Sequence, residues 1–316
     1  MNKRVVLGID TSNYTTSVAI LDLKGELIAN LKRPLPVKPG EHGLRQSDAV
    51  FAHVKNLPDI MNEAHKYLEE CECVAVGVSE RPRNVDGSYM PCFLSGLAVA
   101  ESISATLNIP IFKFSHQCGH IMAALYSSGR FDLFDKEFCA FHVSGGTTEV
   151  LRVKPSGFSF FAELVGGTRD LNAGQVIDRV GVRMGFPFPA GRYLEEAAKC
   201  NTLPLPTSRP RVIDLEVNLS GLENMADTLY RKTSSRELVS AFVLKYVGSA
   251  LTKLADAYVQ KYGNTEFVFA GGVMSNTLIK ADILKKYKAS FAEPALSQDN
   301  AVGIAYLTLR KYNSEN

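Results

Sequence analysis

The chain has 316 residues, of which 46% are hydrophobic and 22% charged, and its formal net charge at pH 7 is +2. This length is too great for one compact core, so we expect two domains with the ordinary composition of a globular protein. A charge so close to zero argues against a strongly electrostatic nucleic-acid binder, although it leaves room for a local basic face. The sequence has no 18-residue apolar run and no signal segment at 1–9, so we expect a cytoplasmic protein without membrane contact. Its six cysteines are scattered and, without an export signal, are expected to be reduced thiols.

The N-terminal segment has the pattern of a three-stranded meander. Apolar runs separated by polar or glycine-containing turns predict strands at 5–10, 17–22 and 26–33. A second meander begins about 130 residues later, with strands predicted at 138–144, 149–154 and 158–165. Both meanders have a hydroxyl-rich first turn, which favours a duplicated fold over the alternative of two unrelated meanders.

The first turn of each meander carries groups suited to a nucleotide or a cation. Backbone N–H groups and small hydroxyl side chains can surround a phosphate, and Ser144-Gly145-Gly146 is the better candidate because two glycines let the backbone approach closely. In the other turn, Asp10 at the strand end could hold a cation or a water beside Ser12. Taken singly, a Gly-Gly turn is more often an ordinary hairpin.

Helices and strands alternate between the two meanders. Apolar periodicity predicts helices at 47–70, with a kink near Pro58, and at 94–107. Buried strands are predicted at 74–79 and 109–114. The polar segment 80–91, which contains Arg81 and Arg83, is predicted to be a loop.

The segment His116-Gln117-Cys118-Gly119-His120 is the strongest local motif. If 116–126 is a helix, the two imidazoles lie one turn apart on one face and can share a metal ion. The alternative is a pair of hydrogen-bonded histidines on a half-buried helix. Gln117 stands where a zinc protease has a glutamate base, and an amide cannot act as a base, so a protease is disfavoured. Cys118 is expected to point away from the histidine face.

The C-terminal half offers further candidate ligands. Asp178 is expected on a helix at 168–185 that is broken by the proline-rich segment 186–191. Ser234-x-x-Glu237 is a capping-box signature for a long amphipathic helix. A strand at 267–270 followed by Gly271-Gly272 and a helix would point helix N–H groups at a ligand. Asp299, before the last helix, is either the helix cap or the third metal ligand, and a His/His/Asp set suits Zn²⁺ or Fe²⁺.

These features resemble one known family. The α/β alternation, the duplicated meander and the three glycine turns look like the two-lobed actin/Hsp70/sugar-kinase (ASKHA) ATPase fold. The motifs occur in the order seen in the TsaD family of tRNA N6-adenosine threonylcarbamoyltransferases, over nearly the whole chain. They are Gly8-Ile9-Asp10-Thr11-Ser12, His116-x-x-x-His120, Val143-Ser144-Gly145-Gly146-Thr147, Gly174-Gln175-x-x-Asp178, Pro187-x-Pro189-Ala190-Gly191, Ala270-Gly271-Gly272-Val273-x-x-Asn276 and Asp299-Asn300-Ala301.

The resemblance implies an N-terminal lobe at 1–132 with the histidine pair, a C-terminal lobe at 133–298 with the nucleotide turns, and a last helix at 299–312 that packs back on the first lobe. It implies one divalent metal, Fe²⁺ or Zn²⁺, on His116, His120 and Asp299. Threonylcarbamoyl-AMP, AMP or ATP is then expected on His142, Val143, Ser144, Gly145, Gly146, Asp178, Gly191 and Asn276, with Asp10, Ser12, Gly271 and Gly272 contributing through their turns. No catalytic residue beyond the metal ligands is assigned.

The implied activity is the transfer of a threonylcarbamoyl group from its adenylate to N6 of an adenosine in tRNA (t6A synthesis). The implied partners are tRNA, sister proteins of the same pathway (TsaB/TsaE-like) and a second copy in a homodimer. The chain departs from the family pattern at Asn13–Thr16, at Thr147 in place of a histidine, in the loop 80–91, and at Arg169-Asp170-Leu171-Asn172, where paired acids are expected. These departures indicate a divergent paralogue and leave two alternatives, namely a non-catalytic nucleotide-binding scaffold or the same acyl transfer to a non-tRNA acceptor.

Overall fold

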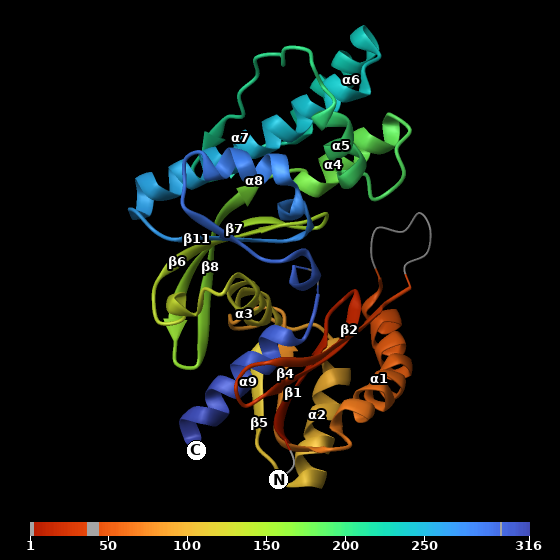
Figure 1. The fold of residues 1–316 in the computed structure, drawn as a ribbon, viewed down its shortest axis with the longest axis vertical. Coiled ribbons are helices and arrows are strands. Elements are labelled where there is room, and N and C mark those ends of the chain that lie inside the picture. The colour runs from red at the N-terminus through yellow and green to blue at the C-terminus, as the bar shows by residue number, and fades with distance from the viewer. Residues whose placement is uncertain (1–2, 37–43, 298) are drawn as a thin grey trace. The chain divides into compact units, whose positions relative to one another are not determined.

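The computed structural model describes residues 3–36, 44–297 and 299–316 of the chain (Figure 1). The chain divides into two compact units. Unit 1 comprises Met1–Lys136, Lys154–Ala162 and Ala295–Asn316, and unit 2 comprises Glu137–Val153 and Glu163–Pro294. The C-terminal segment that carries Asp299 therefore belongs to the same unit as the two histidines.

Unit 1 is built on a five-stranded mixed sheet with the order β3-β2-β1-β4-β5. Its strands are β1 (Lys3–Thr11), β2 (Thr15–Asp22), β3 (Leu27–Pro34), β4 (Cys71–Arg81) and β5 (Ile111–Ser115). The first three strands pair antiparallel, as the predicted meander requires, and β4 and β5 continue the sheet in parallel from β1.

Helices cover both faces of this sheet (Figure 1). The helices of unit 1 are α1 (Gln46–Leu68), α2 (Phe93–Leu107), α3 (His116–Ser128) and α9 (Val302–Glu315), with a 3-10 turn at Phe131–Leu133. Alternate apolar residues of β1, such as Leu7 and Ile9, share a core with residues of α1 and α2. The opposite face of β1 carries Gly8, against which α9 packs closely, and α3 packs in turn on α9.

Unit 2 repeats the strand order of unit 1. Its sheet has the order β12-β11-β6-β7-β8-β10-β9. The strands are β6 (Phe138–Val143), β7 (Thr148–Ser156), β8 (Ser159–Thr168), β9 (Val212–Ile213), β10 (Glu216–Val217), β11 (Phe267–Ala270) and β12 (Ala289–Phe291). The run β8-β7-β6-β11-β12 matches β3-β2-β1-β4-β5, including the parallel additions after the meander. The predicted two-lobed α/β fold with duplicated mixed sheets is confirmed.

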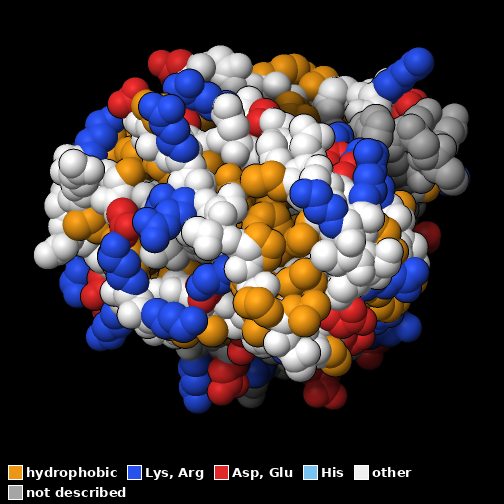
Figure 2. Space-filling view, turned by 90° about the horizontal axis from the view of Figure 1, so that it is seen from above, with side chains coloured by type: hydrophobic (Ala, Val, Ile, Leu, Met, Phe, Trp, Pro, Cys, Tyr) orange, Lys and Arg blue, Asp and Glu red, His pale blue; other side chains and the backbone are white. Residues whose placement is uncertain are grey.

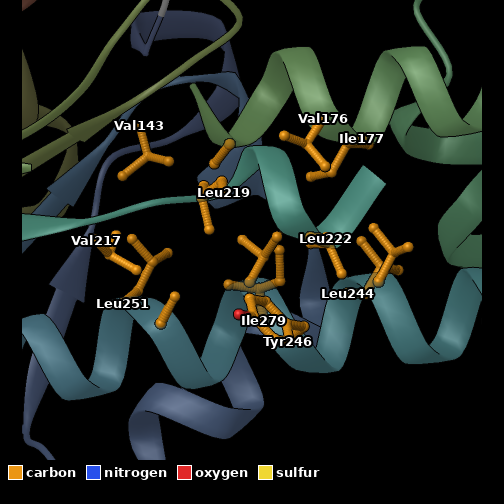
Figure 3. Close-up of a cluster of buried hydrophobic side chains, with 14 of the residues drawn as sticks. Val143, Val176, Ile177, Val217, Leu219, Leu222, Leu244, Tyr246, Leu251 and Ile279 are labelled. Atoms are coloured by element: carbon orange, nitrogen blue, oxygen red, sulfur yellow. The ribbon is translucent and has the colours of Figure 1, made fainter. Parts of the chain in front are cut away.

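The helices of unit 2 are α4 (Ala173–Arg183), α5 (Gly191–Lys199), α6 (Ser220–Thr233), α7 (Arg236–Tyr262) and α8 (Thr277–Leu284), with a 3-10 turn at Gly272–Ser275. A further 3-10 turn, Pro294–Leu296, begins at the last residue of unit 2 and continues into unit 1. The core of unit 2 lies along α7, whose Leu244, Tyr246 and Leu251 contribute to one apolar cluster with Val143 and Ile279 (Figure 3). Within the described residues, α7 is the one helix long and apolar enough to cross a membrane, but 72% of its apolar window is buried in the protein. Such burial is typical of a core helix.

Several helix starts differ from the sequence predictions. The last helix, expected at 299–312, spans Val302–Glu315. The helix expected from residue 168 begins only at Ala173, because β8 continues to Thr168. The capping box expected at Ser234 is wrong by one residue: Ser235 caps α7 by accepting a hydrogen bond from the N–H of Leu238. Ser234 instead ends α6 in the left-handed region, with φ of 52°, because α6 and α7 are joined too closely for both serines to have the extended cap conformation.

Candidate metal centre and nucleotide turns

The histidine pair lies at the start of α3, directly after β5. Ser115 caps this helix, since its side chain accepts a hydrogen bond of 3.2 Å from the N–H of Cys118. The helix makes His116 and His120 neighbours on one face, and their ring centroids are 4.3 Å apart. The predicted helix at this segment is confirmed.

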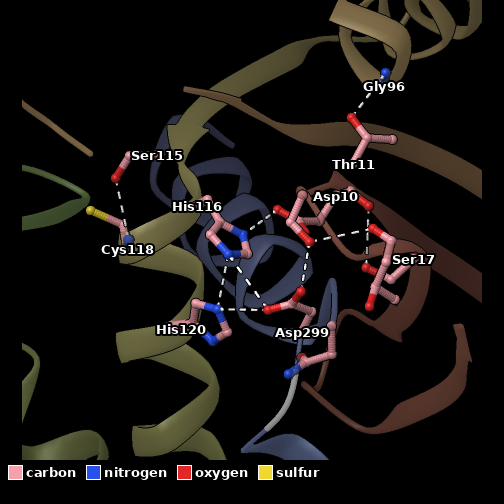
Figure 4. Close-up of polar contacts among 12 residues, drawn as sticks. Asp10, Thr11, Ser17, Gly96, Ser115, His116, Cys118, His120 and Asp299 are labelled. Carbon is pink, nitrogen blue, oxygen red and sulfur yellow. Dashed lines mark hydrogen bonds and ion pairs between the residues drawn. The ribbon is translucent and has the colours of Figure 1, made fainter. Parts of the chain in front are cut away.

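The side chain of Asp299 completes a group of three candidate ligands (Figure 4). Nε2 of His116 and Nε2 of His120 are 2.9 Å apart. Oδ1 of Asp299 is 3.2 Å from Nε2 of His120 and 3.7 Å from Nε2 of His116. Ligand atoms about 2.0–2.1 Å from a tetrahedral metal ion are separated by about 3.3 Å, so these donors fit one ion.

The local charges favour a cation at this point. Burial disfavours a charged His116, but the charge of Asp10, its hydrogen bond and the charge of Asp299 together raise the pKa of His116 to about 9. Burial likewise opposes ionisation of Asp299, yet hydrogen bonds and charges from His120 and His116 lower the pKa of this carboxyl well below its ordinary range. An ionised carboxylate beside two inward-facing imidazoles is a donor set that could hold a divalent cation.

Asp299 does not cap the last helix. The residue before α9 is Ala301, and the side chain of Asn300 accepts a hydrogen bond of 2.9 Å from the N–H of Val302. The carboxylate of Asp299 is thus available to the histidines. Of the two alternatives that the sequence left open for this residue, the helix cap is wrong, and the role of metal ligand stays a prediction.

Two other residues of the histidine motif lie outside the ligand group. The thiol of Cys118 is buried and hydrogen-bonds to the backbone oxygen of Phe160, 3.2 Å away, as its predicted position on the far face of the helix requires. The backbone N–H of Gln117 donates to the carbonyl of Pro82. The loop predicted at 80–91 begins only at Pro82, because β4 continues to Arg81, and its first residue adjoins the first turn of α3.

A close contact between two glycines fixes the distance between α3 and α9. A Cβ at Gly303 would lie 1.8 Å from the carbonyl oxygen of Gly119, and a Cβ at Gly119 would lie 2.9 Å from the side chain of Ile304. Gly119 lies between the two histidines, and Gly303, the second residue of α9, lies four residues after Asp299. Sequence reasoning missed this role, although Gly119 stands inside the histidine motif.

The predicted phosphate turn of unit 2 lies between β6 and β7. The N–H of Ser144 donates to Thr147, and the N–H of Gly146 donates to the hydroxyl of Ser144. A Cβ at Gly145 or Gly146 would meet nothing within 4 Å, so the turn has an open side that a ligand could approach. His142 and Val143 are the last residues of β6 before this turn.

The start of α4 is held against the same turn. The N–H of Gly174 donates to the carbonyl of Ser144, and the N–H of Ala173 donates to the hydroxyl of Thr148. Sequence reasoning missed Thr148, whose place directly after the glycine pair was the available signal. A cavity of about 350 Å³ beside the turn is lined in part by Gly146, Thr147 and Asn172.

Three further candidate residues of unit 2, Gly271, Gly272 and Asn276, lie between β11 and α8. Gly271 has φ of 101° and approaches the end of β6 so closely that a Cβ would lie 2.2 Å from the carbonyl oxygen of Val143. Gly272 follows it in a 3-10 turn, and Asn276 caps α8 by accepting hydrogen bonds from Leu278 and Ile279. Gly271 therefore brings this turn to the end of β6, beside Ser144.

Asp178 on α4 contacts the residue that precedes Gly191 at the start of α5. Oδ1 of Asp178 accepts a hydrogen bond of 2.7 Å from the N–H of Ala190, and Gly191 begins α5. Burial raises the pKa of Asp178 above its ordinary value, against the opposing effect of this hydrogen bond. The predicted ligands of unit 1 (Asp10, Ser12, His116, His120 and Asp299) thus form one group. Those of unit 2 lie at the turn after β6, at the turn before α8, and on α4 and the start of α5.

Solved structures define the class of the fold. The chain is similar to HypF of T. kodakarensis, with a TM-score of 0.62 at 12% identity over 99% of this chain and 48% of that one. It is also similar to component A of the (R)-2-hydroxyglutaryl-CoA dehydratase of Acidaminococcus fermentans, with a TM-score of 0.53 at 15% identity over 98% and 99% of the two chains. The protein has the two-lobed ASKHA fold.

Sequence comparison then identifies the family within this fold. The profile of TsaD, tRNA N6-adenosine threonylcarbamoyltransferase, matches residues 39–306, so the chain belongs to the TsaD family. Proteins named tRNA N6-adenosine threonylcarbamoyltransferase from Streptococcus gordonii and Streptococcus sanguinis are 28% and 29% identical to it, over 100% of this chain and 95% of each relative.

Proposed function

We propose that this protein transfers a threonylcarbamoyl group from threonylcarbamoyl-AMP to N6 of an adenosine in tRNA, in the cytoplasm and with the help of a divalent metal. The observation that carries the proposal is the convergence of His116 Nε2, His120 Nε2 and Asp299 Oδ1 in a chain of the TsaD family. A protein that served only as a scaffold would have no physical need for three inward-facing ligand atoms.

The proposed reaction is an acyl transfer. The N6 nitrogen attacks the carbamoyl carbonyl carbon, the bond from that carbon to the phosphate oxygen breaks, AMP leaves and N6 loses a proton. A bound Zn²⁺ or Fe²⁺ would supply Lewis-acid polarisation of the carbonyl. The donor set of two imidazoles and a carboxylate suits both metals.

The residues of unit 2 would bind the leaving adenylate. The backbone N–H of Gly145, a residue whose Cβ position is open, is proposed to bind its phosphate, whereas the N–H of Gly146 already donates to the Ser144 hydroxyl. Asp178 keeps one carboxylate oxygen on Ala190, and its second oxygen is proposed to accept from a ribose hydroxyl. Gly191 at the start of α5 and Asn276 at the start of α8 would complete this subsite. ATP or AMP would occupy it in the absence of the adenylate.

Loops with basic residues are the proposed contacts of the tRNA backbone. Arg83, Arg209 and Arg211 are exposed. Figure 2 shows Lys and Arg side chains distributed around a strip of hydrophobic side chains on one face. Phosphate contacts of this kind would make binding weaken steeply with salt. Sister proteins of the pathway are proposed as further partners.

A second candidate function keeps the chemistry and changes the acceptor. It is favoured by Thr147, which lines the cavity beside the phosphate turn at a position where the family usually has a histidine. The loss of an imidazole there, together with the near-neutral net charge, would suit a small amine as acceptor.

Complementation separates the two candidates. A bacterial host is depleted of its own transferase, this chain is expressed with the host's partner proteins, and the modified adenosine is quantified by mass spectrometry of digested tRNA. We expect the nucleoside to be restored by the natural chain and by Gly221→Ala, whose Cβ would meet nothing within 4 Å, but not by Asp299→Ala. A folded, metal-binding protein that restores none would overturn the tRNA acceptor, and adenylate-dependent transfer to small amines would then establish the second candidate.

A further inference from the structure

Asp10 and Ser12 lie too deep to contact a nucleotide directly. Their exposed fractions are 0% and 2%. Both residues come from the end of β1 and the turn after it, the segment that sequence reasoning assigned to phosphate or cation binding. Each instead makes a side-chain hydrogen bond to a different candidate metal ligand within unit 1.

Asp10 orients the ring of His116 (Figure 4). Its Oδ1 is 2.8 Å from Nδ1 of His116. A carboxylate can only accept, so Nδ1 carries the proton, and in the neutral imidazole the lone pair is then on Nε2. Nε2 is the atom that faces His120 and Asp299. A carboxylate on the far nitrogen also makes the imidazole a stronger donor to a metal.

Ser12 orients Asp299. Its hydroxyl donates a hydrogen bond of 2.8 Å to Oδ2 of Asp299, which leaves Oδ1 directed at His120. Ser12 is itself held by His53, a fully buried residue of α1 whose Nε2 donates to the Ser12 carbonyl over 2.8 Å. Nδ1 of His53 accepts from the hydroxyl of Thr16, also at 2.8 Å, so both nitrogens of this neutral ring are used.

We propose that Asp10 and Ser12 are positioning residues for a divalent metal of borderline softness, Zn²⁺ or Fe²⁺, on His116, His120 and Asp299. In this proposal the hydroxyl-rich turn of unit 1 serves the metal, while its counterpart in unit 2 serves the nucleotide. The two turns of the duplicated fold thus have different functions. The proposal rests on the metal site of the proposed function but not on the identity of the acceptor.

The test compares three variants of the full chain. Ser12→Ala removes the hydrogen bond to Asp299, and Asp10→Asn keeps an acceptor oxygen for His116 but removes the charge. Ser17→Ala is the matched control, because its hydroxyl is equally buried but bonds to the backbone oxygen of Asp10 rather than to a ligand side chain. Zn²⁺ affinity is measured by competition with a chromophoric chelator, the Co²⁺ form gives a ligand-field spectrum, and AMP affinity is measured by calorimetry.

We expect Ser12→Ala and Asp10→Asn each to weaken Zn²⁺ binding by about 10–100-fold and to alter the Co²⁺ spectrum. AMP affinity should stay within about twofold of the natural chain, and Ser17→Ala should match the natural chain in both affinities.

Four outcomes would count against these assignments. If the natural chain binds no Zn²⁺ or Co²⁺, the metal site of the proposed function fails as well. If it binds both metals and the two variants bind them equally well, only the positioning roles fail. If the variants lose AMP affinity while their metal affinity is intact, Asp10 and Ser12 bind the nucleotide rather than position the metal ligands. If Ser17→Ala loses as much Zn²⁺ affinity as the two variants, the effect comes from lost packing.

Discussion

The contact between Gly119 and Gly303 should control metal binding without either glycine touching the metal. In Gly303→Ala, the new Cβ would lie 1.8 Å from the carbonyl oxygen of Gly119 and 2.8 Å from the backbone nitrogen of Ala123. These are backbone atoms of α3, so no side-chain rotation can relieve the clash. The start of α9 must therefore move away from α3.

The size of this movement follows from contact distances. A methyl carbon and a carbonyl oxygen approach to about 3.3 Å at closest, so the two backbones would have to separate by roughly 1.5 Å. Metal sites tolerate errors of about 0.2 Å in ligand distance. Because Asp299 lies four residues before Gly303 in the segment that leads into α9, and both histidines flank Gly119, the separation should move the carboxylate out of reach of an ion on the histidines. Overpacking of this kind also costs about 1–3 kcal/mol of the free energy of unfolding.

The assay pairs urea unfolding of the metal-free protein with Zn²⁺ competition. Gly221→Ala is the matched control, since Gly221 and Gly303 are the second residues of α6 and α9, and a Cβ at Gly221 would meet nothing within 4 Å. We expect Gly303→Ala to lose stability and at least tenfold in Zn²⁺ affinity, and Gly221→Ala to lose neither. Zn²⁺ affinity in Gly303→Ala equal to that of the natural chain would refute the reasoning.

Three further predictions concern stability and nucleotide binding. Burial lowers the pKa of His53 below its unfolded value of about 6.5, so the folded state loses stability as the pH falls from that value toward the folded pKa. The variant His53→Gln should therefore flatten the dependence of the urea midpoint on pH between 7.5 and 5.5, and an unchanged dependence would contradict this. Asn276→Ala should lower the free energy of unfolding by about 1 kcal/mol, because it removes the cap of α8. Asn276→Asp should keep the cap and, under the proposed function, weaken AMP binding through its added charge, which calorimetry would measure. Ser235→Ala should lower the free energy of unfolding by about 1 kcal/mol and Ser234→Ala by much less, and the reverse order would restore the capping box expected at Ser234.

The sequence by itself determined the two three-stranded meanders and the local position of the histidine pair. Short apolar runs and polar or glycine-containing turns are local signals, so both meanders could be predicted from the sequence alone. The same holds for His116 and His120, because four residues on a helix always span one turn. The confirmed TsaD family follows from the order of short motifs along the chain.

Tertiary structure decided how those motifs are used. Asp299 is far from the histidines in sequence, and only the packing of α9 on β1 and α3 places it beside them instead of at a helix cap. Asp10 and Ser12 have the same local pattern as the phosphate turn of unit 2, and their burial under the ligand group depends on contacts that no local pattern encodes. The close contact of Gly119 with Gly303 is likewise invisible in the sequence, because a helix pattern gives the face of a glycine but not the partner that approaches it.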